Sequence, residues 1–168
     1  RIANFFLTFS GAVMTALYPR AGELSVRRAA IIPVYFRAMR WTIMIFLGLA
    51  AALMVSGDEI LVLLKGTAFI GDGRPIWMAT IAALALTMIP GIPSVITEGF
   101  NKPQITALFA AISAVLTVGL TVLLVPRYGL IGAPLALLVN ALVQQPVAIA
   151  VMNRHAIGVS NRRFLREV

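Results

Sequence analysis

Two arginines, Arg37 and Arg40, have the residue type and spacing best suited to binding chemistry. They lie three positions apart near the start of an apolar stretch, so on a helix they share one face. Guanidinium groups present forked N–H donors that match phosphate oxygens, so two of them about a turn apart would suit an anionic phosphate group. The alternative interpretation is that both side chains snorkel to the cytoplasmic interface and anchor the topology.

The sequence offers no set of residues for catalysis or for metal binding. Cysteine is absent, and the single histidine, His155, has no other candidate ligand near it in the sequence. The six acidic residues are scattered, and no glycine-rich loop has the pattern of a nucleotide site. We therefore expect neither an enzyme nor a cofactor.

The elements that must position the arginines are long and apolar. Hydrophobic residues make up 60% of the chain, against about 45–50% in an ordinary soluble domain. About 20 apolar helical residues cross a bilayer, and in lipid a helix satisfies its own backbone. We predict an all-α, polytopic transmembrane helix bundle with spans at about 2–18, 33–56, 76–97, 105–125 and 130–152.

The net charge of +8 is placed between and after these stretches. Arginines cluster between the first two stretches and again in the tail, 153–168, whereas 57–75 carries acidic residues. The positive-inside rule therefore puts 20–32 and the basic tail in the cytoplasm and 57–75 outside. Strict alternation of the spans then places 98–103 inside and 126–129 outside. This placement favours anionic membrane lipids as general partners and argues against nucleic acid.

Two local patterns predict details of the bundle. Pro90 and Pro93 each lack an N–H, so we expect a kink or break in the third span. The fourth span has small and hydroxyl residues at helical spacing, which indicates a close-packing face. This face carries Thr106, Ala110, Ser113, Thr117 and Thr121.

The chain begins with Arg1, and the apolar run has already started at Ile2. Five spans with an outside start and an inside end would suit the last helices of a larger protein. We therefore expect a C-terminal part, with an N-terminal lobe missing.

Three junctions together are similar to one transporter family. Leu63–Phe69 resembles an outer loop of leucines, glycine and an aromatic residue, and Gly99–Pro103 resembles a Lys-Pro inner turn. Val125–Ala133 resembles the proline, aromatic, glycine and glycine-alanine entry to a late helix, although Pro134 departs from the usual small residue. These features resemble the bacterial polysaccharide and O-antigen flippases of the multidrug/oligosaccharidyl-lipid/polysaccharide exporter superfamily.

The resemblance covers essentially the whole chain, as helices eight to twelve of a twelve-helix protein. It implies most of the second lobe of a two-lobed transporter in the bacterial cytoplasmic membrane, working by alternating access. The substrate would be an oligosaccharide linked to a polyprenyl pyrophosphate. Sites in transporters built from repeats lie at the interface between the halves.

Three further residues are candidates under this interpretation. Glu98 would suit ion or proton coupling, although an ordinary acid at a helix end is the alternative. Asn140 and Gln144, at i and i+4, would suit sugar hydroxyls, with hydrogen bonding between helices as the alternative.

Two other functions stay open. A drug or cation antiporter of the same superfamily would need membrane-embedded acids, of which Glu98 is the one candidate here. A small, non-transporting membrane subunit is the other alternative, against which the Arg1 start and the odd number of spans both argue.

Overall fold

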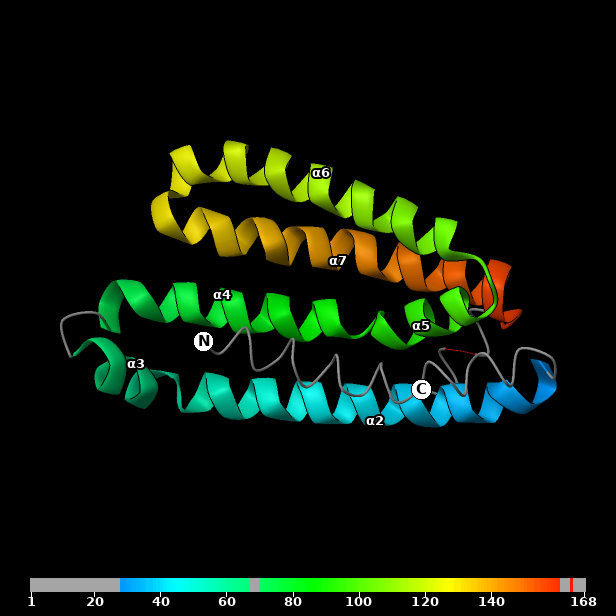
Figure 1. Ribbon diagram of the computed structural model, residues 1–168. Coiled ribbons are helices and arrows are strands. Elements are labelled where there is room, and N and C mark those ends of the chain that lie inside the picture. The colour runs from blue at the N-terminus through cyan, green and yellow to red at the C-terminus, as the bar shows by residue number, and fades with distance from the viewer. Residues whose placement is uncertain (1–27, 67–69, 161–163, 165–168) are drawn as a thin grey trace.

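The computed structural model describes residues 28–66, 70–160 and 164, and all regular elements in these ranges are helical (Figure 1). Within the described residues, three helical stretches are long and apolar enough to cross a membrane: Ile31–Val55, Gly73–Gly99 and Pro103–His155. The predicted all-α membrane class is therefore supported, whereas five separate spans are not confirmed. The predicted span 2–18, residues 20–27 of the basic connector and most of 161–168 lie outside the described residues.

Helix α2 runs over Arg28–Val55, and its candidate membrane-spanning stretch, Ile31–Val55, lies close to the predicted span 33–56. Its inner face carries Ile31, Tyr35 and Met39 at intervals of four, and each is at most 1% exposed. Pro33 is the sixth residue of the helix, and Ile31 before it is buried on the same face as Tyr35 and Met39.

A short helix, α3 (Gly57–Lys65), turns the chain toward α4 (Ile70–Met88). Trp77 ties this end together, because its indole N–H donates a 2.8 Å hydrogen bond to the Leu53 carbonyl. A Cβ on Gly57 would lie 2.8 Å from the same indole ring, so a side chain there would collide with Trp77. Arg74 and Asp58 add an exposed ion pair at 3.3 Å.

The third apolar stretch is broken where the prolines predict. Helix α4 ends at Met88, and α5 runs over Gly91–Gly99 after a turn at Ile89 and Pro90. The hydroxyl of Ser94 donates to the Pro90 carbonyl at 2.8 Å, and that of Thr97 donates to the Pro93 carbonyl at 2.7 Å. These side chains support the backbone in the first turns after the break.

Helices α6 (Pro103–Tyr128) and α7 (Gly132–Met152) form a hairpin closed by a three-residue 3₁₀ turn, η2, at Gly129–Ile131. Gly129 has φ +63°, a conformation that favours glycine. A Cβ on Gly132 would lie 2.6 Å from the Leu124 carbonyl carbon and oxygen. The two glycines of the Val125–Ala133 motif therefore make the turn and the close approach, and Pro134 is accommodated in the first turn of α7.

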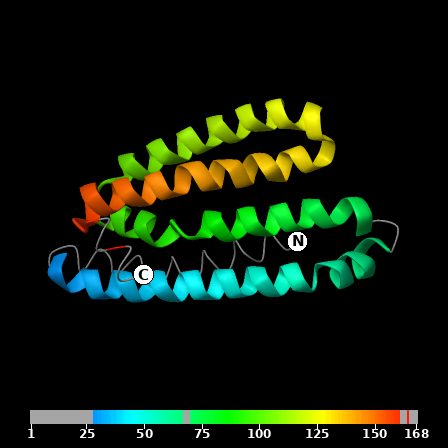
Figure 2. The same ribbon diagram turned by 180° about the vertical axis from the view of Figure 1, so that it is seen from behind.

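The helices follow one another in space as α6, α7, α4–α5 and α2, and the view from behind shows the same order (Figure 2). Helix α7 therefore lies between α6 and α4. Figure 1 places α3 and η2 at one end of the bundle, and the α5–α6 turn and the π-helical turn η3 (Asn153–Ile157) at the other. This grouping agrees with the charge-based topology, which assigns those two ends to opposite sides.

Candidate functional site

The structure places both predicted arginines on one exposed face of α2. They line a pocket of about 490 Å³. The described residues that line it all come from α2 and recur at helical spacing: Pro33, Phe36, Arg37, Arg40, Trp41 and Met44.

This basic-aromatic groove combines two kinds of contact. The guanidinium groups of Arg37 and Arg40 supply positive charge and multiple N–H donors. Trp41 is 59% exposed beside them and offers an apolar ring face. The set suits an anionic group that carries an apolar or ring-shaped neighbour.

The second predicted pair, Asn140 and Gln144, lies between α6 and α7. The Asn140 amide nitrogen donates to the hydroxyls of Ser113 at 2.8 Å and Thr117 at 2.9 Å. The Gln144 amide nitrogen donates to the Phe109 carbonyl. These contacts match the alternative interpretation, hydrogen bonding between helices, and they confirm that Ser113 and Thr117 lie on a packing face.

A smaller cavity of about 150 Å³ lies beside Gln144, between α5, α6 and α7. Its described lining includes Ser94, Thr106 and Ser113, and it holds neither Arg37 nor Arg40. The structure thus brings each predicted pair together, but Gln144 lines a different pocket from Arg37 and Arg40.

Glu98 is partly exposed near the end of α5. Its backbone carbonyl accepts the amide of Asn101 at 2.9 Å in the turn to α6. In the same turn, the Lys102 ammonium donates to the His155 carbonyl at 2.7 Å, which links the turn to η3. Within the described ranges, no group of three or more acids and histidines is placed to hold a metal ion.

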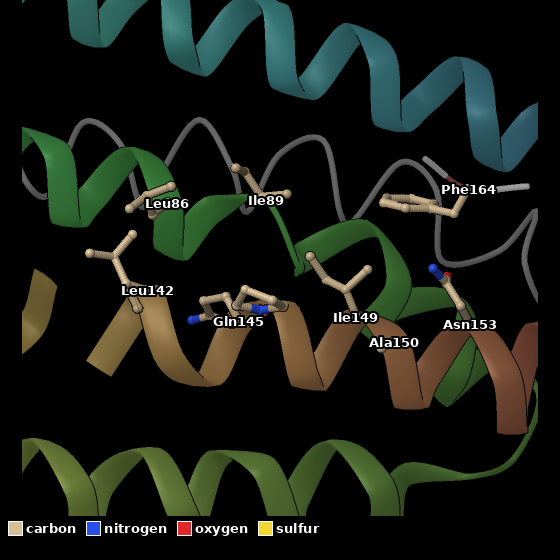
Figure 3. Close-up of a pocket in the computed structure, with 10 residues that line it drawn as sticks. Leu86, Ile89, Leu142, Gln145, Ile149, Ala150, Asn153 and Phe164 are labelled. Carbon is tan, nitrogen blue, oxygen red and sulfur yellow. The ribbon is translucent and has the colours of Figure 1, made fainter. Parts of the chain in front are cut away.

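One pairing was not visible in the sequence. The Tyr35 hydroxyl donates to the Asn153 side-chain oxygen at 2.6 Å, across a separation of 118 residues. Asn153 also lines an apolar pocket of about 360 Å³, where Leu86 and Ile89 of α4 and the following turn face Leu142 and Ile149 of α7 (Figure 3). No periodicity relates two single polar residues so far apart, so only the fold reveals their contact.

Comparison of the chain with protein-family models, with curated proteins and with solved structures finds no match.

Proposed function

We propose that this chain is part of a membrane flippase that moves a polyprenyl-pyrophosphate-linked oligosaccharide across the bacterial cytoplasmic membrane by alternating access. The observation that carries the proposal is the basic-aromatic groove on α2. Paired guanidinium groups match the oxygens of a pyrophosphate, and an indole face packs well against a sugar ring or an isoprenoid chain.

The groove also has a suitable depth in the membrane. Arg40 is the tenth residue of the apolar stretch Ile31–Val55, so its Cα lies about 14 Å along the helix axis from that of Ile31. A charge at this depth is costly unless it faces a polar cavity or reaches the interface. A carrier pyrophosphate entering from the cytoplasmic side would meet both groups in this range.

We assign five crossings to the chain in this proposal. The hairpin stretch Pro103–His155 crosses twice, because α6, with 26 residues, and α7, with 21, lie side by side. Helices of these lengths rise about 39 and 31 Å, and a hydrocarbon core is about 30 Å thick. The predicted crossing 2–18 lies outside the described residues, and in this proposal a further lobe would complete the cavity.

The double variant Arg37→Gln/Arg40→Gln tests the role of the groove. It removes both charges and keeps hydrogen-bonding capacity, so export of glycan to the cell surface should be lost while the amount of protein in the membrane is unchanged. The Lys/Lys double variant should restore export in part, because lysine keeps the charge and loses the forked donors.

Arg154→Gln is the matched control, since Arg154 is exposed on the end of the bundle that the charge pattern also assigns to the cytoplasm. It should leave export unchanged. Full export by the Gln/Gln variant, or loss of export only through inverted insertion, would identify Arg37 and Arg40 as topology anchors and reject the site.

A further inference from the structure

The cavity between α5, α6 and α7 is lined by residues whose buried polar atoms lack hydrogen-bond partners among the described residues. Thr106 and Gln144 both line it, and neither the Thr106 hydroxyl oxygen nor the Gln144 amide oxygen, both buried, has a hydrogen-bond partner among the residues that the structure describes. Gln144 is only 6% exposed. Buried polar atoms in native proteins are nearly always paired with protein or with ordered water.

The orientation of the Gln144 amide is fixed by its neighbour. Its nitrogen donates to the Phe109 carbonyl, and a flipped amide would place two acceptor oxygens against each other. The amide oxygen must therefore face away from that contact and needs a donor from elsewhere. One helical turn earlier, the Asn140 amide oxygen is also buried and has no partner among the described residues, while its nitrogen donates to Ser113 and Thr117.

The cavity is large enough and polar enough for water. Its volume of about 150 Å³ exceeds the about 10–15 Å³ that one water molecule requires, and hydroxyls of Ser94, Thr106 and Ser113 line it. The hydroxyl of Ser94 already donates to the Pro90 carbonyl, at the break before α5. Water can donate to the oxygens of Gln144 and Thr106 at the same time as it accepts from a hydroxyl.

A metal cation fits the cavity less well than water. The described lining residues are all uncharged, so no carboxylate would balance a cation that has left its hydration shell. A lipid chain would leave the same oxygens without donors.

We propose that this cavity is a water-binding site that reaches from the α5–α6 turn into the membrane-spanning part of the bundle, as far as Ser113. Thr106 lies in the first turn of α6, near Lys102, and Ser113 lies seven residues further along, at about 10 Å of helical rise. This water-binding site lies apart from the basic-aromatic groove, and the proposal is independent of the proposed transport function.

Cysteine accessibility tests the site directly, because the chain contains no cysteine of its own. Ser113→Cys is compared with Leu108→Cys and Val115→Cys, in the full protein in lipid nanodiscs, using a small charged methanethiosulfonate reagent. Leu108 is 59% and Val115 is 73% exposed on the apolar surface of the same helix, and they bracket Ser113 in depth. A thiol reacts as its thiolate, which requires water, so Ser113→Cys should react at least about tenfold faster than both controls.

Two further variants connect the reaction rate to this cavity. Thr106→Val/Gln144→Leu, in the Ser113→Cys background, removes the two unpaired oxygens and should slow labelling by about tenfold. Ala110→Leu, in the same background, fills the cavity without removing a polar group and should slow labelling as well. The Ala110→Leu variant keeps the proposal testable if the Thr106→Val/Gln144→Leu variant does not fold.

Equal labelling rates at positions 108, 113 and 115 would overturn the proposal by showing a dry cavity. Unchanged labelling in the Ala110→Leu variant would place the water elsewhere and would also overturn it. If sodium chloride but not choline chloride slowed the labelling of Ser113→Cys, the occupant of the cavity would be a cation and not water, and the proposal would be overturned.

Discussion

The hydroxyl of Tyr35 on α2 donates a 2.6 Å hydrogen bond to the side-chain oxygen of Asn153 at the end of α7, and both side chains have no exposed surface. The rings of Phe36 and Phe164 lie 5.4 and 6.2 Å from the Tyr35 ring, between centroids. This buried bond joins the two ends of the described chain at one end of the bundle.

Tyr35→Phe should lower the free energy of unfolding by about 1–3 kcal/mol, because it leaves the Asn153 oxygen buried and unpaired. The Asn153 amide nitrogen already has no partner within the described residues, so no second bond compensates. Thermal unfolding in detergent measures the effect. Tyr128→Phe, at a side chain that is 58% exposed, is the matched control and should be neutral. Equal melting temperatures for the two variants would contradict the structural role of the bond.

Gly132→Ala should destabilise the α6–α7 hairpin. Its Cβ would lie 2.6 Å from the Leu124 backbone, so the helices would have to separate, at a cost of about 1–3 kcal/mol. Gly119→Ala on α6 is the control, because no heavy atom lies within 4 Å of its new Cβ. That change should be neutral or stabilising by up to about 1 kcal/mol. A Gly132→Ala protein as stable as Gly119→Ala would show that the close approach is not needed.

At the opposite end of the bundle, Trp77 should matter more than the ion pair beside it. Trp77→Phe removes the hydrogen bond to the Leu53 carbonyl and leaves space beside Gly57, so we expect a loss of about 1–3 kcal/mol. Asp58→Asn should cost less than about 1 kcal/mol, because the Arg74 and Asp58 side chains are 56% and 43% exposed. Denaturation of both variants in the same detergent compares them, and a larger loss for Asp58→Asn would reverse this order.

Single cysteines should label from opposite sides of the membrane at the two ends of the bundle. Glu59→Cys and Arg127→Cys are expected outside, whereas Asn101→Cys and Arg154→Cys are expected in the cytoplasm. All four side chains are exposed, so burial does not prevent the reaction. An impermeant maleimide applied to intact cells should therefore label the first pair alone. Labelling of Asn101→Cys together with Glu59→Cys would reject the topology.

Local sequence signals predicted most of the helical architecture. The lost N–H groups of Pro90 and Pro93 placed the break correctly. Such features act within one or two helical turns, so the sequence displays them directly. The apolar stretch of α2, predicted at about 33–56, lies at Ile31–Val55 in the structure, so composition alone located it closely.

Contacts between distant segments were harder to predict. The i, i+4 spacing put Asn140 and Gln144 on one face but did not say which surface that face meets. The structure shows it against Ser113, Thr117 and the Phe109 carbonyl of α6. Arg37 and Arg40 share their predicted face because helical geometry alone decides that relationship.

The α6–α7 hairpin also bears on how the chain enters the membrane during synthesis. None of the α6 residues is buried, and the strongest packing of α6 is against α7, to which η2 joins it. The partners of Asn140 are Ser113 and Thr117, which precede it by 27 and 23 residues and leave the ribosome first. The hairpin therefore brings its own hydrogen-bond partners for the Asn140 amide nitrogen into the lipid. The two helices can leave the translocation machinery as a pair, before α7 docks against α4.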